Sequence, residues 1–382
     1  MKYPFVLLSL FLFGGATYQN VQKAPSFSEP AASGDTLTLR EIYSLPPEQW
    51  PAPFVDDTIV WQELGSLPEP RFPGDSLPDT RLVELGKQLF FDPRLSSSGQ
   101  VACVSCHHPD LNWADGRRNA MGHDLREGKR NSMSILNTWF YKELFWDGRA
   151  GSLEAQVHFP LEDSVEMNAV TEFVVRKLTD IPGYQSQFQA LFGKDEVEAE
   201  DMFRAIATFE RTITSRKSDF DYFLEGKTHR MSDEALQGLH LFRTKARCMN
   251  CHNGPLFTDN QFHNVGLTYY GRKYEDLGRY HVTGLPEDIG KFRTPSLRDV
   301  MRTRPWMHNG IFDSMEGILN MYNMGMPRPK PRKEMENDPL FPVTSPLLHK
   351  LGLTKQEKEA IIAFLHSITA ASSRISRPEL PQ

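Results

Sequence analysis

Apolar side chains recur at helical spacing in several separate stretches of the chain. Over 80–91, Leu82, Leu85 and Leu89 fall on one face together with Phe90, which predicts an amphipathic helix. Runs that alternate between apolar and polar residues, as strands do, are scarce, so we expect a mainly α fold. The same helical spacing predicts further helices over 173–178, 182–191, 202–213 and 232–242.

Two sequence signals mark where helices begin in the second half. Ser232, followed by two acidic residues, has the pattern of an N-cap. Thr354 stands three residues before Glu357, which is the spacing of a capping box. Apolar residues at Ile361 and Leu365 follow, so we expect a packed final helix.

Long stretches between the predicted helices show no periodicity. The chain contains 27 Pro and 26 Gly among 382 residues, a content typical of turns and long loops. Residues 18–79 are rich in Pro, Ser and acidic side chains and are predicted to be a linker or strap lying over the surface. Residues 221–231 are polar and are predicted to join two halves. Such a chain can gain order by wrapping a large apolar cofactor.

All four cysteines lie in two Cys-x-x-Cys-His runs, Cys103-Val104-Ser105-Cys106-His107 and Cys248-Met249-Asn250-Cys251-His252. This is the attachment sequence of a c-type haem, in which the thiols add to the vinyl groups and the histidine ligates the iron. His makes up only 12 of 382 residues, so two such runs are not expected by chance. The sequence therefore predicts two covalent haems c.

Two other uses of the cysteines compete with haem attachment. A four-thiolate zinc site would need neither histidine, and structural zinc sites usually pair Cys-x-x-Cys runs that lie closer together. Two disulfides would suit an exported protein, although a Cys-x-x-Cys pair is more often a redox motif. Only haem attachment accounts for both histidines.

Each run follows a predicted helix, so the second half repeats the order of the first. This predicts a diverged duplication, with two cytochrome c-like haem domains in tandem and long loops between the helices. We expect the N-terminal haem domain over 80–225 and the C-terminal haem domain over 226–370. A short tail, 371–382, follows.

The N-terminus has the composition of a signal peptide. Met1-Lys2 is followed by an apolar stretch over 5–13 and by small residues, so 1–17 is predicted to direct export. We expect a periplasmic protein, with an uncleaved membrane anchor as the less favoured alternative. The net charge of −6 argues against nucleic acid as a partner. The basic run over 328–333, broken by prolines, is interpreted as a solvated loop.

A haem with one histidine ligand and an open face can bind hydrogen peroxide, and O–O cleavage then needs a group that moves a proton between the two oxygens. In this context the region from Leu82 to Thr369 resembles the bacterial dihaem cytochrome c peroxidase family, which includes the MauG-type enzymes. The resemblance rests on segments in the family order: 89–93, 103–107, 130–132, 145–149, 160–161, 166–167, 209–212, 257–259, 292–298 and 307–310.

The resemblance implies a role for each haem and its surroundings. His107 would hold the peroxide-binding haem, and His252 the electron-transfer haem. Glu166 matches the acid–base residue of O–O cleavage, with Gln156 beside it on the distal face. Trp146 matches a tryptophan between the two haems, although it could equally be a core aromatic residue.

The resemblance also implies a calcium site and a gate. Asn131 matches a calcium ligand, together with the backbone carbonyls of Thr303 and Pro305, and a hard cation with few protein oxygens is chemically reasonable. His123 matches a loop histidine that closes the peroxidatic haem in the resting form, and a solvent-exposed histidine is the alternative. Movement of that loop would be gating rather than chemistry.

The distal ligand of the second haem separates the two branches of the family. Family peroxidases use methionine there, whereas the position in this chain, fourteen residues after His308, is Tyr322, as in MauG-type enzymes. A phenolate would lower the potential of the haem, whereas thioether ligation raises it. Met321 and Met324 flank the tyrosine and are the alternatives.

The sequence therefore predicts a cytochrome-c peroxidase-type oxidoreductase that reduces hydrogen peroxide with electrons from a small periplasmic donor, a cytochrome c or a cupredoxin. A MauG-type enzyme that uses peroxide to oxidise a protein or another substrate is the alternative. A dihaem electron carrier without turnover is a third possibility, but it would not need Gln156 and Glu166. The resemblance also raises the possibility of a homodimer, which is common among family peroxidases.

Overall fold

The computed structural model describes residues 37–75, 77–372 and 374–382. The predicted signal peptide, 1–17, and residues 18–36 of the predicted strap lie outside these residues. Within them, no helix combines the length and the apolar character needed to cross a membrane. The helices and strands are α1 Leu39–Tyr43, α2 Thr80–Phe91, α3 Cys103–Cys106, α4 Leu153–Glu162, α5 Thr171–Thr179, α6 Pro182–Phe192, α7 Ala199–Arg211, α8 Asp219–Leu224, α9 Asp233–Arg243, β1 Phe262–His263, α10 Tyr280–Thr283, β2 Phe292–Arg293, α11 Met315–Asn323 and α12 Lys355–Ser367.

The predicted helices are confirmed, and local signals explain their ends. The Asp79 side chain caps α2 by accepting a hydrogen bond from the backbone N–H of Arg81, and Pro93 follows the helix, where it cannot continue the hydrogen-bond ladder. Ser232 caps α9. Thr354 and Glu357 form the predicted capping box at the start of α12. The one sheet among the described residues pairs β1 with β2 in antiparallel register, so the fold is mainly α.

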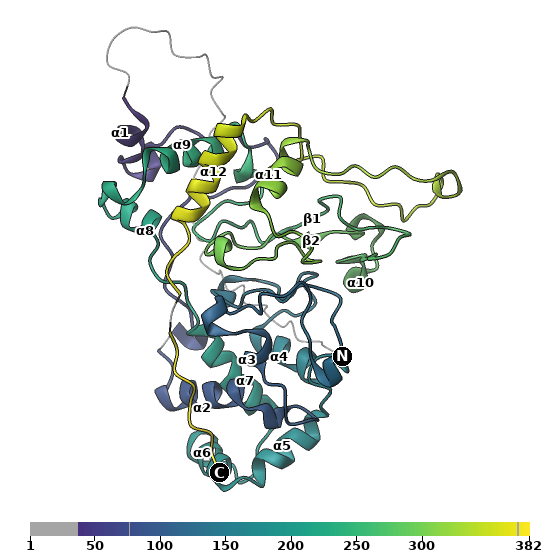
Figure 1. Ribbon diagram of the computed structural model, residues 1–382. Helices are drawn as coiled ribbons and strands as arrows, with labels where there is room; N and C mark the ends of the chain where they lie inside the picture. Colours follow the sequence, from purple (N-terminus) through teal and green to yellow (C-terminus); the bar gives the residue numbers. More distant parts are fainter. Residues whose placement is uncertain (1–36, 76, 373) are drawn as a thin grey trace, which may run out of the picture. The chain divides into compact units, whose positions relative to one another are not determined.

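Two hydrophobic cores organise these helices (Figure 1). In the first, α2 packs against α7, and Leu85 and Leu89 of α2 are fully buried. In the second, α9 packs against α12. Each pair of helices stands next to a Cys-x-x-Cys-His run, so each core supports one of the two predicted haem sites.

The two helix pairs cross in the same way. A Cβ atom added to Gly86 of α2 would lie 1.9 Å from the carbonyl oxygen of Ala205 in α7. A Cβ atom added to Gly238 of α9 would lie 1.9 Å from the carbonyl oxygen of Ala360 in α12. Any side chain at either glycine would force the helices apart, so the backbones meet at glycine in both pairs. This matched crossing fits the predicted duplication.

The segment before α2 is not only a surface strap. Tyr43 of α1, Trp50 and Leu64 are buried in the second core, so this part of the predicted strap belongs to the interior. The Arg243 guanidinium of α9 donates hydrogen bonds to Glu63 and to the carbonyl oxygen of Pro51, which fastens the segment to α9.

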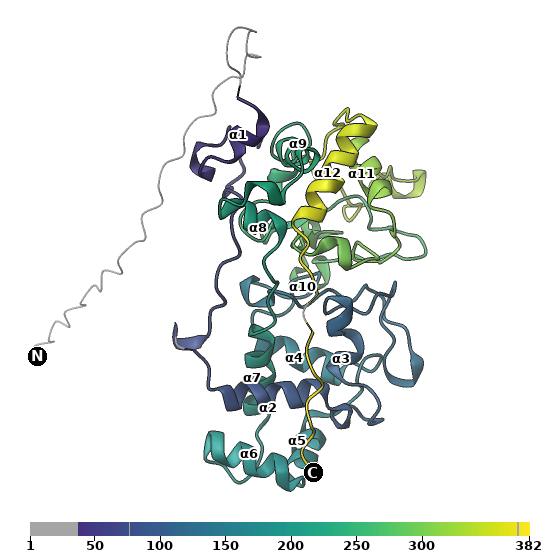
Figure 2. The same ribbon diagram turned by 60° about the vertical axis from the view of Figure 1, so that its left-hand side comes forward.

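The C-terminal tail returns to the first core. Figures 1 and 2 show the chain leaving α12 and running to α6. The N–H of Gly183 donates to the carbonyl oxygen of Gln382 at 3.0 Å, and Ile375 packs against the first core. The segment before α2 therefore completes the second core, and the C-terminal tail completes the first.

The stretch over 221–231 differs from its prediction as a polar joint. Asp221 lies in α8 and is buried, and it pairs with Arg298 through hydrogen bonds of 2.9 and 3.0 Å. Phe223 and Met231 are buried in the second core. The prediction of a polar joint was wrong because the charge of Asp221 is neutralised by Arg298, a residue distant in sequence, which allows Asp221 to be buried. The second core therefore begins before residue 226, where its domain was expected to start.

Candidate functional site

The first Cys-x-x-Cys-His run lines a cavity between α3, α4 and α7. Its residues in this cavity are Cys103, Cys106 and His107. Gln156 and Pro160 of α4 line the same cavity, as do Glu166 in the following loop and Glu210 of α7. The structure thus brings the two predicted distal residues together with the predicted iron ligand.

His107 is oriented for metal binding. Its Nδ1 lies 3.1 Å from the carbonyl oxygen of Trp113. Because a carbonyl can only accept, Nδ1 carries the proton and Nε2 is free to bind a metal. Burial lowers the pKa of His107, which favours the neutral ring that a metal requires.

Glu166 is a half-buried carboxyl group in the same cavity. Burial raises its pKa, the neighbouring Asp163 carboxylate adds to the rise, and Arg149 opposes it. A raised pKa keeps a carboxyl group close to the range in which it can both take up and release a proton. Glu166 could therefore move a proton within this cavity.

His123 does not line the first cavity in this conformation. Its Nδ1 lies 3.3 Å from the hydroxyl of Ser97, and its Nε2 lies 3.2 Å from a carboxylate oxygen of Asp124. The backbone N–H of His123 donates to the carbonyl oxygen of Glu166 at 2.7 Å. The loop therefore contacts the distal segment through its backbone while its imidazole is engaged elsewhere.

The second run lines a separate cavity with α11. Cys248, Cys251 and His252 face it together with Tyr322. The Nδ1 of His252 lies 2.9 Å from the carbonyl oxygen of Phe257, which repeats the arrangement of His107. Burial raises the pKa of Tyr322, and the two cysteine sulfurs add to the rise.

The two methionines beside Tyr322 are placed differently. Met324 is 65% exposed, and Met321 packs against the second core. Neither lines the second cavity, whereas Tyr322 does. In this conformation the tyrosine is the member of the trio that faces the cysteines and His252.

Trp146 and the predicted calcium ligands meet at the second cavity. Trp146, Asn131, Thr303 and Pro305 all line it. The indole N–H of Trp146 donates to the carbonyl oxygen of Asn131 at 3.0 Å, and the N–H of Asn131 donates to the carbonyl oxygen of His308 at 2.8 Å. The Nδ2 of Asn131 donates to the carbonyl oxygen of Arg117 at 2.8 Å, so a cation would have to bind its Oδ1 atom.

Comparison with known proteins agrees with this geometry. Residues 80–229 match the family described as di-haem cytochrome c peroxidase. The cytochrome-c peroxidase IdrP1 of Pseudomonas sp. (strain SCT) is 34% identical over 337 residues, covering 80% of this chain and 86% of that protein. The methylamine utilization protein MauG of Methylorubrum extorquens is 37% identical over 302 residues, covering 78% and 81%.

The chain belongs to the di-haem cytochrome c peroxidase family. The crystal structure of a MauG-like protein associated with microbial copper homeostasis superposes with a TM-score of 0.72 at 30% identity, covering 84% of this chain and 99% of that one. Membership makes the chain an oxidoreductase and implies haem c as its cofactor, and it confirms the tandem cytochrome c-like fold. Both peroxidases and MauG proteins are among the relatives.

The residues of this chain fit two haems c and not the other uses of the cysteines. All four thiols are free, so neither run forms a disulfide. The two runs line different cavities, so the cysteines do not assemble a four-thiolate site. Burial raises the pKa of the Cys106 thiol to about 12, which keeps it protonated. In both cavities the residues next to the thiols are mostly apolar, as the faces of a haem require.

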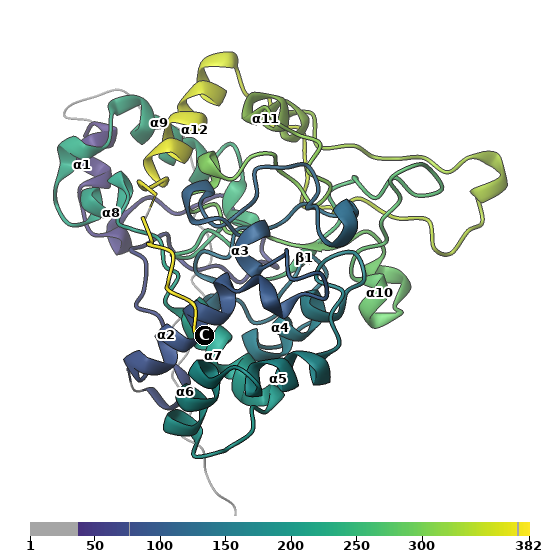
Figure 3. The same ribbon diagram turned by 60° about the horizontal axis from the view of Figure 1, so that its bottom comes forward.

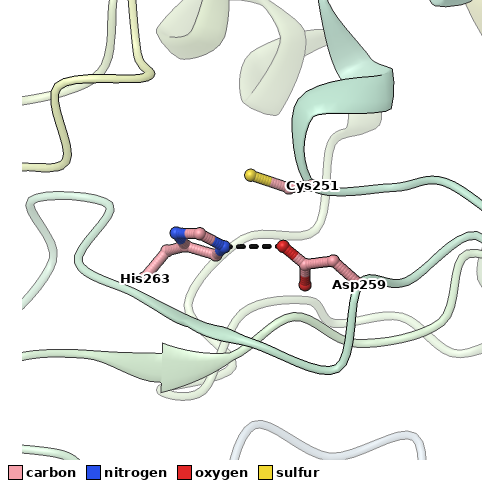
Figure 4. Close-up of side chains that lie close together, drawn as sticks. All are labelled: Cys251, Asp259 and His263. Atoms are coloured by element: carbon pink, nitrogen blue, oxygen red, sulfur yellow. Dashed lines mark hydrogen bonds and ion pairs between the residues drawn. The ribbon is translucent and has the colours of Figure 1, made fainter. Parts of the chain in front are cut away.

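A further cluster lies beside the second attachment run (Figure 4). Ligand atoms of Cys251, Asp259 and His263 lie within 4.8 Å of one another, and the Nε2 of His263 is 2.8 Å from a carboxylate oxygen of Asp259. Burial opposes protonation of His263, but Asp259 and the Cys251 sulfur raise its pKa to about 10. Because attachment of haem would alkylate Cys251, we interpret the cluster as an ion pair of Asp259 and His263 beside the attachment run rather than as a separate metal site.

Sequence reasoning missed two groups near the cavities. Glu210 of α7 is buried in the first cavity, and burial raises its pKa to about 8, with Arg211 opposing the rise and Glu154 adding to it. Arg130 forms ion pairs with Asp147 at 2.5 Å and with Asp276 at 2.6 Å. The signal for Glu210 was a carboxylate directly after the core residue Phe209, whereas nothing local in the sequence marks Asp276 as a partner of Arg130.

Proposed function

We propose that this protein reduces hydrogen peroxide to water in the cavity of His107. Electrons would come from a small periplasmic donor, a cytochrome c or a cupredoxin, through the second haem. The observation that carries the proposal is the meeting of His107, Gln156 and Glu166 in one cavity. An electron carrier has no use for a half-buried carboxyl group of raised pKa beside its iron ligand.

In this proposal the bound haem supplies the iron that takes the peroxide and passes electrons to it. Glu166 would accept the proton of the inner oxygen and give it to the outer one, which leaves as water. Gln156 would orient the peroxide through its amide. Two further protons and two electrons complete the conversion of one hydrogen peroxide into two waters.

The direct test is Glu166→Gln, which keeps the shape of the side chain and removes its acid–base function. We expect peroxide turnover to fall by about 10²–10⁴-fold while both haems remain attached. Glu172→Gln, at an exposed position of α5, is the matched control and should leave turnover unchanged. Wild-type turnover in Glu166→Gln would exclude this role.

A second candidate function is MauG-type oxidation of a protein or another substrate with peroxide as the oxidant. Its support is that Tyr322 faces the second cavity, whereas Met324 is 65% exposed. A phenolate ligand would make the second haem a poor store of electrons and suit it to sharing oxidising equivalents. A sulfur-to-iron charge-transfer band in the near infrared of the oxidised protein would exclude the tyrosine ligand.

Four further assignments belong to the same proposal. His123 would close the first haem in a resting conformation different from the one described. Asn131, Thr303 and Pro305 would hold a calcium ion beside Trp146, and removal of calcium by a chelator should then change the spin state or the activity. The export signal predicted over 1–17 would place the protein in the periplasm. The protein would also form a homodimer, which a sedimentation measurement on the purified protein would identify.

A further inference from the structure

Glu210 of α7 is a buried carboxyl group that the proposed function does not use. Its side chain lines the first cavity together with Cys103 and Glu166, and the residue is only 5% exposed. Among the described residues none donates a hydrogen bond to its carboxyl group, and its pKa responds to burial and to the charges of Arg211 and Glu154. A buried carboxyl group without a hydrogen bond is costly to keep charged, so its ionisation will depend on the charge that the cavity holds.

The matching position in the second half of the chain is apolar. Phe209 in α7 and Phe364 in α12 each pack on the aromatic residue whose carbonyl oxygen orients the histidine of the attachment run. The next residue is Glu210 in α7 and Leu365 in α12, and each of them lines its own cavity. The fold therefore accepts an apolar side chain at this position, and it does not need the carboxyl group of Glu210 to form.

An ion pair that acts on Glu210 leads towards the surface. The guanidinium of Arg211 lies 2.8 Å from a carboxylate oxygen of Glu154 in α4, and both charges affect the pKa of Glu210. The Glu154 side chain is 33% exposed and lines a separate outer groove with His158. Among the described residues, no charged group of α2 or α5, which also pack against α7, affects this pKa. The ion pair therefore offers a route by which a proton can reach Glu210 from solvent.

A carboxyl group inside a closed cavity acts strongly on any charge that is bound there, because a low dielectric constant strengthens the Coulomb interaction. The Nε2 of His107 is free to bind the haem iron in this cavity, and an oxidised iron carries one more positive charge than a reduced one. That charge favours the ionised carboxylate, so reduction should raise the pKa of Glu210. Burial alone already raises this pKa to about 8, which places the ionisation within an accessible pH range.

We propose that Glu210 is the proton-loading group of the first cavity and takes up one proton from solvent when an electron arrives at the haem site of His107. The electron comes from the donor, the proton enters past the pair of Arg211 and Glu154, and an O–H bond forms on the Glu210 carboxylate. No other bond in the protein changes. The inference goes beyond the proposed function and does not rest on it, because it concerns the reduction of the site and not the fate of peroxide.

The pH dependence of the reduction potential of the first haem tests the proposal, in the protein carrying both haems. If one proton accompanies one electron, each tenfold fall in proton concentration lowers the potential by up to about 59 mV. In the wild type we expect this fall around pH 8. Glu210→Gln stays uncharged and should keep the potential of the low-pH form through this range. Glu210→Asp retains a carboxyl group and should restore the fall.

Variants of the neighbouring groups show whether Glu210 is the group responsible. The ionisable groups that act on it or share its cavity are Arg211 on α7, Glu154 on α4, Glu166, and the thiols of Cys103 and Cys106. Haem attachment converts the thiols into thioethers, and the haem propionates are common to all variants. Glu166→Gln should keep a fall around pH 8, because Glu210 is intact. Glu200→Gln, at an exposed position of the same helix, is the matched control and should keep it too.

A pH-indicator dye in weakly buffered solution gives a second readout, since reduction around pH 8 should draw fewer protons from solution in Glu210→Gln than in the wild type. A wild-type fall in potential or wild-type proton uptake in Glu210→Gln overturns the proposal.

Arg211→Gln decides the question if Glu210→Gln does not retain both haems. It removes the positive charge that opposes the rise in the pKa of Glu210, so the fall in potential should move to higher pH. A fall that does not move overturns the proposal. Wild-type peroxide turnover in Glu166→Gln overturns the proposed function instead and leaves this inference standing.

Discussion

In the N-terminal half, Phe90 of α2, Trp113 and Phe209 of α7 form a triangle of rings with centroids 5.4–6.1 Å apart. In the C-terminal half, a triangle at 5.2–6.1 Å joins Phe242 of α9, Phe257 and Phe364 of α12. The middle residue of each triangle also supplies the carbonyl oxygen that accepts from the histidine of the attachment run. The two halves thus share one way of holding a histidine.

The halves differ in the residue that follows the α7 or α12 aromatic. Glu210 follows Phe209 and lines the first cavity, whereas Leu365 follows Phe364 and lines the second. Glu166 likewise lines only the first cavity, and Tyr322 only the second. The comparison teaches that the scaffold is repeated while the groups facing each cavity are not. We infer that the scaffold fixes where the haems are held and that the facing groups decide their chemistry.

The largest effect should come from breaking the shared helix crossing. Gly86→Ala and Gly238→Ala each place a Cβ atom 1.9 Å from a carbonyl oxygen of the partner helix, so each should lower the free energy of unfolding by about 3 kcal/mol or more. Denaturant unfolding of the haem-containing protein measures the loss. Gly151→Ala is the control, because its Cβ would meet nothing within 4 Å. If either variant had the same free energy of unfolding as Gly151→Ala, the two helix crossings would not be equivalent.

The next effect concerns the facing groups at the second haem. Tyr322→Met replaces the phenolate by a thioether, so the reduction potential of the second haem should rise by roughly 100 mV. A potentiometric titration would measure this rise. The potential of the first haem should change little. Met324→Leu, at an exposed position, should leave both potentials unchanged, and an unchanged potential in Tyr322→Met would mean that another residue closes this haem.

An effect that depends on pH should follow from Glu210, whose pKa of about 8 lies above its ordinary value of 4.5. Between these values the folded state binds more protons than the unfolded state, so stability falls as the pH rises from about 4.5 to 8. Glu210→Gln should flatten this fall, by at most about 1.4 kcal/mol for each unit of pKa difference. Thermal unfolding at pH 5, 6.5 and 8 checks the slope. An equally steep fall in the variant would show that Glu210 titrates normally.

The smallest effect should come from Trp146, which lies next to groups of both halves. Trp146→Phe keeps an aromatic ring and removes the indole N–H that donates to the carbonyl oxygen of Asn131. The free energy of unfolding should fall by about 1 kcal/mol. If the ring also carries electrons between the haems, stopped-flow absorbance will show slower reoxidation of the second haem by peroxide. An unchanged reoxidation rate would leave Trp146 with a packing role.

The sequence predicted the parts of the molecule that depend on local patterns. The helices over 80–91 and 355–367 have regular apolar spacing and caps, and the two attachment runs carry their own signature. The burial of Tyr43 and Trp50 could not be predicted in this way, because single aromatic residues in a Pro-rich stretch show no periodicity. The pairing of Asp221 with Arg298 joins residues far apart in sequence, so composition alone suggested a solvated joint.

The candidate site could be predicted where the family resemblance supplied positions, as for Gln156 and Glu166, which the structure brings into the cavity of His107. The orientation of His123 could not, because it depends on contacts with Ser97 and Asp124. Glu210 was missed because residue type alone does not distinguish a glutamate at a core-facing position of a helix from one at the surface. Figure 3 shows the loop between α11 and α12 extending from the helices, and its basic run over 328–333 is mostly exposed, as expected for a solvated loop.

The central claim is that the two haem cavities are unequal, and the binding of carbon monoxide to the fully reduced protein tests it most directly. The account predicts one carbon monoxide for every two haems, because it assigns Tyr322 as the residue that closes the second. It also predicts that the carbon monoxide stretching band shifts in Glu166→Gln and stays in place in Glu172→Gln, because Glu166 faces the ligand. Two bound molecules, none, or a band insensitive to Glu166 would contradict the account.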